Sequence, residues 1–126
     1  MANWQSRKRA VSAMPRRAIS IRQPWVEMIL RGLKKNEYRS VPTNIRGRVY
    51  IYASLRAADE QWAWTKIKAT PEDLPKGKIV GTVEVVGCRW DARKNCYAYA
   101  LECPKRLRHP RVAQNQPNPL WWIPKF

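Results

Sequence analysis

The chain has 126 residues, a mass of 14.8 kDa and 44% hydrophobic residues, which suffices for one small domain with a modest core. It carries 25 Lys and Arg against 9 Asp and Glu, a net charge of +16 at pH 7. Five of these cations lie among residues 1–17, which contain no acid, so residues 18–126 still carry +11. Because like charges repel one another in a compact fold, this excess predicts a polyanionic partner such as nucleic acid.

Composition also excludes several classes of protein. No segment approaches ~20 uninterrupted apolar residues, and the basic N-terminal segment lacks the apolar core of a secretory signal, so we expect a soluble, intracellular protein (cytoplasmic or nuclear) with no membrane partner. The three cysteines, Cys88, Cys96 and Cys103, have no C-x-x-C spacing, and His109 is the single histidine. We therefore expect no metal and no cofactor, and no Ser-His-Asp or Cys-His catalytic group.

In chain order, residues 1–17 are predicted to form a flexible basic arm and residues 18–126 a single domain. Residues 18–21 are predicted to form a strand. The first helix is expected from Pro24, which suits a first helical turn, to Arg31, because Gly32 is placed to end it. Residues 37–41 are predicted to form the next strand, and a turn follows at residues 42–44.

Alternation then marks a strand over residues 47–54, where Val49 and Ile51 share one face and Arg48 and Tyr50 share the other. The pattern predicts a helix over residues 57–68 and a short capped helix at residues 70–73. Two long strands, residues 78–88 and 96–103, are expected to be joined by a basic hairpin tip. Residues 104–119 are predicted to be irregular, and residues 120–123 to return as a closing strand.

The most specific pattern lies between Ser20 and Arg39. It resembles the signature of the ASCH domain, a PUA-like family, through an S-x-x-Q-P-W entry and a G-x-K-x-x-E-x-R run. The matching positions are Ser20, Gln23, Pro24, Trp25, Gly32, Lys34, Glu37 and Arg39. The resemblance continues through residues 46–54 and 81–85 and covers about residues 18–126. It implies an α+β fold, a small, closed, mostly antiparallel PUA-like β-barrel decorated by two or three short helices.

The same cluster supplies the candidate binding residues. Trp25 could stack on a base, Gln23 and Glu37 could hydrogen-bond a base edge, and Arg39 could contact a phosphate or a guanine. Arg46 and Arg48 add cations that could contact the phosphate backbone of the nucleic acid. We therefore predict a nucleic-acid-binding domain that uses a basic cleft between the first helix and the barrel, with RNA (single-stranded, or a modified base) preferred over DNA. A monomer is favoured.

Two alternatives stay open for the charged residues. Glu37 and Arg39 could instead form an ion pair that holds their strand. Lys34 could neutralise a phosphate, or it could lose its proton when desolvated and act as a base or nucleophile.

The resemblance also implies enzymatic alternatives. Some ASCH-like proteins are amidohydrolases of acetylated cytidine that use a motif Lys with a Thr and a Glu, and others are ribonucleases that use Lys with hydroxyl side chains. Here Lys34 matches, while Glu37 occupies the position expected for the Thr, and Tyr52 stands where many relatives carry His. A small hydrolase would therefore use Lys34, Glu37 and Ser54, although Ser54 could simply cap the following helix. A protein-interaction module with an acidic partner is a third possibility.

Overall fold

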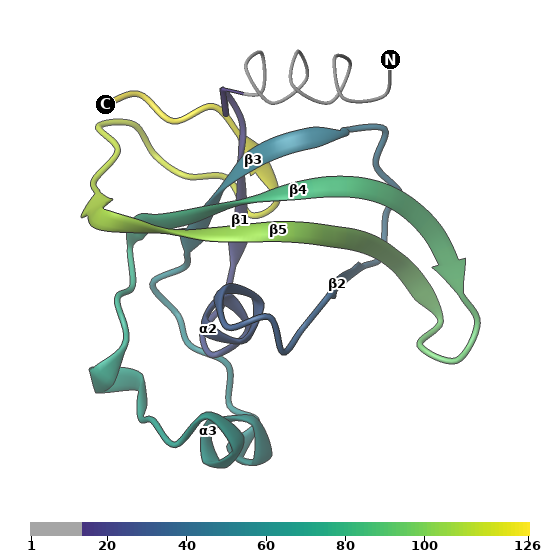
Figure 1. The fold of residues 1–126 in the computed structure, drawn as a ribbon, viewed down its shortest axis with the longest axis horizontal. Helices are drawn as coiled ribbons and strands as arrows, with labels where there is room; N and C mark the ends of the chain where they lie inside the picture. Colours follow the sequence, from purple (N-terminus) through teal and green to yellow (C-terminus); the bar gives the residue numbers. More distant parts are fainter. Residues whose placement is uncertain (1–13) are drawn as a thin grey trace.

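A computed structural model of the chain describes residues 14–126, so most of the predicted basic arm, residues 1–13, lies outside the described residues. One six-stranded sheet has the order β2-β5-β4-β3-β1-β6, and two α-helices and one short 3-10 helix accompany it in the described part (Figure 1). The strands are β1 (Ala18–Ile21), β2 (Asn36–Arg39), β3 (Gly47–Ala53), β4 (Lys78–Asp91), β5 (Cys96–Arg111) and β6 (Trp121–Trp122). The helices are α2 (Trp25–Leu30), α3 (Gln61–Ile67) and the 3-10 helix η1 (Pro71–Asp73).

The predicted α+β class is confirmed, but the predicted closure into a barrel is wrong. β1 runs parallel to β3, and the other paired strands run antiparallel. β2 and β6 form the two edges of the sheet and do not pair with each other. These edge strands have only four and two residues, and each pairs with one neighbour, β2 with β5 and β6 with β1, so a gap remains between β2 and β6.

A side chain spans this gap instead. The Arg39 guanidinium, on β2, donates from Nη2 to the carbonyl of Ser20 in β1 at 2.6 Å and from Nη1 to the carbonyl of Pro119 at 3.3 Å. Pro119 lies just before β6, so one arginine ties both ends of the open sheet together. Charge-assisted bonds of this kind are stronger than neutral ones, which suits a position where backbone pairing stops.

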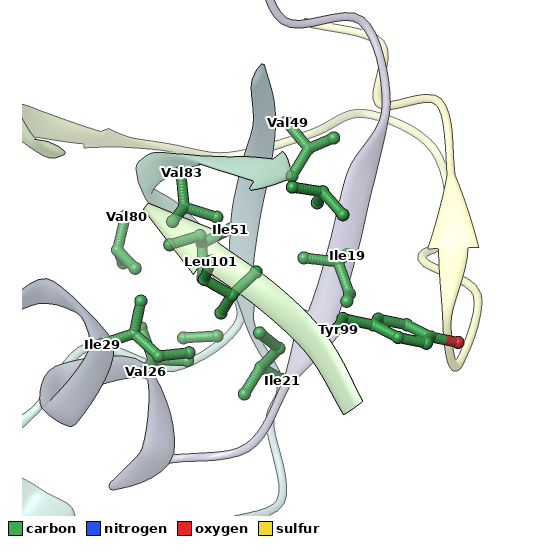
Figure 2. Close-up of a cluster of buried hydrophobic side chains, with 12 residues drawn as sticks. Ile19, Ile21, Val26, Ile29, Val49, Ile51, Val80, Val83, Tyr99 and Leu101 are labelled. Carbon is green, nitrogen blue, oxygen red and sulfur yellow. The ribbon is translucent and has the colours of Figure 1, made fainter. Parts of the chain in front are cut away.

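The main core lies between the sheet and α2. The alternation predicted for β3 is confirmed, since Val49 and Ile51 are buried. Figure 2 shows Val26 and Ile29 reaching from α2 toward the apolar side chains of the sheet. Burial of each such side chain stabilises the fold by ~1.5–3 kcal/mol, so this contact fixes the position of the first helix and of the segment that follows it.

The helix α3 packs on α2. Met28 of α2 contacts a buried cluster that includes Ala63, Trp64 and Ile67 of α3. The helix begins at Gln61, later than the sequence predicts, so Ser54 is not its cap. Residues 54–60 instead form an irregular connection with a bend at residues 55–56, and the backbone N–H of Ala58 donates to the carbonyl of Gln23 at 2.8 Å.

β4 and β5 form a hairpin that is longer than predicted. β5 continues to Arg111, so the prediction of irregular structure from residue 104 is wrong for residues 104–111. Two residues of β5, Cys103 and Pro104, stand opposite the single residue between Thr82 and Glu84 of β4, and Cys103 has a positive φ of 52°. Such a bulge absorbs a proline that would otherwise end the strand pairing. Among residues 14–126 we find no helix with the length and apolar character needed to cross a lipid bilayer.

Candidate nucleic-acid interface

Two adjoining hollows open beside the segment that carries the sequence motif. The first, which we call the aromatic hollow, has a volume of about 450 Å³. It is lined by Trp25, Met28, Leu33, Lys34, Glu37, Tyr38, Glu60, Trp62, Lys66 and Lys94. The second, the arginine hollow, has a volume of about 470 Å³. It is lined by Ser20, Arg22, Trp25, Glu37, Arg39, Ser54, Arg56 and Pro119. Trp25 and Glu37 belong to both, so together they form the wall between the two hollows.

Lys34 reaches into the aromatic hollow between two rings. Its ammonium lies 4.7 Å from the centroid of the Tyr38 ring and 5.7 Å from that of Trp25. It donates to the carbonyl of Asn36 and lies 3.8 Å from Oε1 of Glu37. Burial lowers the pKa of Lys34, and Lys94 and Arg39 push in the same direction, while Glu37 opposes them. The site thus holds an amine that releases its proton more readily than a free lysine.

Glu37 and Arg39 form the ion pair that the sequence left open as an alternative. Oε2 of Glu37 lies 2.8 Å from Nη2 of Arg39 and accepts a hydrogen bond from its Nε at 2.9 Å. Every nitrogen of the Arg39 guanidinium therefore has a protein acceptor, counting the two carbonyls across the open sheet. Oε1 of Glu37 faces Lys34 at a distance longer than a hydrogen bond, so it has room for a further donor.

Gln23 is fully buried beneath the site. Its Oε1 accepts from the backbone N–H of Glu27 at 3.0 Å, inside the first turn of α2, and its Nε2 donates to the carbonyl of Pro75 at 3.2 Å. Both ends of the amide are thus occupied by the protein. In the structure this side chain links the start of the first helix to the segment before β4.

The remaining predicted residues lie at different distances from the two hollows. Ser54 lines the arginine hollow but not the aromatic one, so it does not share a hollow with Lys34. Arg46 donates to the carbonyls of Thr43 and Ile45, and Arg48 donates to Thr82 Oγ1 and to the carbonyl of Cys103. Neither of these two arginines lines either hollow.

Sequence reasoning missed several lining residues. Tyr38 lies inside the motif but does not belong to its recognisable pattern, and Trp62 was hidden within a helical segment. Lys94 comes from the hairpin tip, and its ammonium lies 4.8 Å from the Tyr38 ring centroid. Lys94 comes near the motif because β2 pairs with β5, which places the β4–β5 hairpin beside it. That pairing leaves no signal in a single sequence.

Tyr52, the departure from the common family pattern, lies apart from the two hollows. It is buried and packs edge-on against Trp122, with ring centroids 5.2 Å apart. Burial raises the pKa of its hydroxyl. Within residues 14–126 no group of three or more His, Cys, Asp or Glu is arranged to hold a metal ion.

A six-stranded mixed sheet, with helices on the side that carries two cation-rich hollows, defines a sheet-rich α+β domain. Residues 19–116 match the family model of the ASCH domain, and because this match spans most of the chain, the protein belongs to the ASCH domain family, as the motif predicted. Activating signal cointegrator 1 from Homo sapiens and from Mus musculus are both similar to this chain, each 32% identical over 81 residues. Those matches cover 56% of this chain but only 14% of each relative, so the chain corresponds to a small part of those proteins.

Proposed function

We propose that this ASCH domain binds single-stranded RNA and receives one base in the aromatic hollow. The observation that carries the proposal is the concentration of rings and cations in that hollow. Trp25, Tyr38 and Trp62 line it together with Lys34, Lys66 and Lys94. Aromatic platforms inside a positive groove are the usual means of holding single strands, and each stacked base contributes ~1–3 kcal/mol.

Trp62 is the ring best placed to meet a ligand. It is 62% exposed, and its centroid lies 5.5 Å from that of Trp25 with a tilt of 51°. Leaving a large apolar indole in water is unfavourable, so a ligand that covers the Trp62 ring would be stabilised there, and Trp25 packs against the same ring. The pair therefore offers a prepared surface on which a base can stack.

Glu37 is assigned the base-edge contact. Its Oε1 has room to accept a hydrogen bond from an exocyclic amine, which favours a cytosine or adenine over a uracil. Gln23 is assigned a positioning role, because its amide holds the start of α2 and so the place of Trp25.

The test compares Trp62→Ala with Trp90→Ala. Trp90 is 52% exposed in the β4–β5 hairpin and lines neither hollow, so it is a matched control. We expect Trp62→Ala to weaken binding of a fluorescent single-stranded RNA about tenfold, from the loss of one stacking contact. Trp90→Ala should leave binding within about twofold of wild type. The same sequence as DNA and as duplex RNA should bind more weakly. Equal losses in the two variants would reject the aromatic hollow as the base site.

One observation favours a second function, hydrolysis of RNA or of an acylated cytidine. Lys34 has a lowered pKa and lies beside Glu37, as a general base or nucleophile requires. The hydroxyl that would complete the group is Ser54, across the wall in the neighbouring hollow.

Turnover decides between binding and hydrolysis. Total RNA and a panel of acylated cytidines would be incubated with the wild-type protein and with Lys34→Ala, and the products resolved by chromatography with mass detection. Products that form only with wild type would establish hydrolysis that depends on Lys34. Bound but unaltered RNA with both proteins would leave binding as the function.

A further inference from the structure

The arginine hollow gathers cations from three separate elements. Arg22 follows β1, Arg56 follows β3, and Arg39 belongs to β2. Because β1 and β3 run parallel, their carboxyl ends lie side by side. There the backbone N–H of Ser54 donates to the carbonyl of Ile21 at 2.9 Å. The topology therefore brings Arg22 and Arg56 to the same opening although they are far apart in sequence.

These three arginines differ in how many hydrogen bonds and ion pairs they already make with the protein. Arg39 is already engaged by Glu37 and by two carbonyls, so that each of its three guanidinium nitrogens has an acceptor. Arg22 and Arg56 are exposed, and neither makes a side-chain hydrogen bond or an ion pair with any residue in the part of the chain that the structure describes. Glu37 is the one carboxylate of the lining, and Arg39 already neutralises it. The opening of the hollow thus has two uncompensated guanidinium groups.

We infer that the arginine hollow is a subsite for a phosphate group of the nucleotide whose base lies in the aromatic hollow. This inference rests on the proposed function. The two hollows share the wall made by Trp25 and Glu37, so a base on one side and its own or the adjoining phosphate on the other side belong to one continuous ligand. Guanidinium groups match phosphate oxygens with paired, charge-assisted hydrogen bonds, and the hydroxyl of Ser54 adds a further donor.

In this subsite Arg22 and Arg56 contact the phosphate, and Arg39 holds the wall between the hollows. Nucleoside and phosphate are therefore recognised separately. The aromatic hollow would bind the uncharged nucleoside, and the arginine hollow would add affinity only when a phosphate is attached.

The test measures dissociation constants, by NMR titration, for the four common ribonucleosides and their 5′- and 3′-monophosphates. The proteins are wild type, the double variant Arg22→Gln with Arg56→Gln, and a charge-matched control, Lys105→Gln with Arg108→Gln, whose exposed residues line neither hollow. We expect one of the monophosphates to bind wild type at least about tenfold more tightly than its nucleoside, from one or two charge-assisted bonds. This advantage should vanish in the Arg22 and Arg56 variant and persist in the control, while nucleoside affinity stays unchanged in all three.

Two results would overturn the inference and leave the proposed function intact. One is equal binding of nucleosides and monophosphates by a wild-type protein that still binds single-stranded RNA through Trp62. The other is a phosphate advantage that survives in the Arg22 and Arg56 variant. Failure of RNA and every nucleoside to bind would instead overturn the proposed function, and the phosphate subsite with it.

Discussion

At the scale of single residues, Lys34 is the group whose chemistry the fold changes most visibly. Burial lowers its pKa, and the attraction of Glu37 opposes that effect. We predict that Glu37→Gln lowers the pKa of Lys34 further, because it removes the opposing charge and leaves the repulsion from Arg39 and Lys94. The measurement is an NMR titration of the lysine side-chain Cε and Nζ signals, with Lys34→Arg used to assign the resonance. A Lys34 resonance that titrates at higher pH in Glu37→Gln would contradict this account of its environment.

Gln23 provides a second prediction at this scale. We expect Gln23→Ala to lower the free energy of unfolding by about 2 kcal/mol, because it leaves a buried N–H and a carbonyl without partners and opens a small cavity. Gln61→Ala is the control, since Gln61 is exposed on α3, and it should change stability by less than about 0.5 kcal/mol. Urea unfolding measures both. RNA affinity lost without any loss of stability would mean instead that Gln23 contacts the ligand.

The site could be predicted from the sequence as far as its residues lie within one short segment. Trp25, Lys34 and Glu37 follow one another across a helix end and a strand, so their proximity follows from local structure. Trp62 reaches the aromatic hollow only through the packing of α3 on α2, and Arg56 reaches the arginine hollow only through the parallel pairing of β1 with β3. Those contacts depend on tertiary structure, and no periodicity in the chain signals them.

At the scale of elements, a charged network joins α2 to β5 and α3. Arg106 of β5 contacts Glu27 through two bonds of 2.9 Å, and Arg31 contacts it at 2.7 Å while also donating to the carbonyl of Ile67. Burial alone would raise the pKa of Glu27, but the hydrogen bonds from Arg106 and Arg31 outweigh it and leave the pKa lowered. The network therefore stabilises the packing of three elements only while Glu27 is ionised.

We predict that Glu27→Gln destabilises the protein by about 2 kcal/mol at neutral pH, less than for a fully buried pair because both arginines are partly exposed. A carboxylate with a lowered pKa contributes stability above its unfolded pKa and loses it as the pH falls through the folded one. The difference between wild type and variant should therefore be full at neutral pH and shrink as the pH falls below the ordinary value of 4.5. Urea unfolding over a pH series tests this, and a difference that stays constant in acid would contradict it.

The elements themselves were predicted best where burial imposes a period. β1, β3 and the first helix lie close to their predicted ranges because apolar side chains alternate or recur at helical spacing. The second half of β5 was missed because four of its eight residues, 104–111, are exposed cations and two are the prolines Pro104 and Pro110, a composition typical of a loop. Its strand structure comes from pairing with β4 through bulges in β5 itself, and a bulge leaves no pattern in a single sequence.

At the scale of the whole molecule, the sheet remains open and the motif lies at the opening. The Arg39 guanidinium holds β2 against β1 and the segment before β6 while its Glu37 partner forms the wall between the hollows. The sequence could not reveal whether the barrel closes, because closure depends on the tertiary pairing of β2 with β6, which lie far apart in the chain. Although the last residues of β1 and β3 are buried, the exposed Arg22 and Arg56 that follow them line the arginine hollow together with Arg39.

The net charge of +16 yields the last prediction, since counterion release makes nucleic-acid affinity fall with salt. On single strands the slope of log K against log salt is about −0.7 for each phosphate neutralised. If Arg22 and Arg56 share one phosphate, their double variant should have a slope shallower by about 0.7, and by about 1.4 if each binds its own. Trp62→Ala removes no charge, so it should lower affinity by the same factor at every salt concentration and leave the slope unchanged. Fluorescence anisotropy over a salt series measures both. An unchanged slope of log K against log salt in the Arg22 and Arg56 variant would mean that the RNA phosphates contact another part of the basic surface.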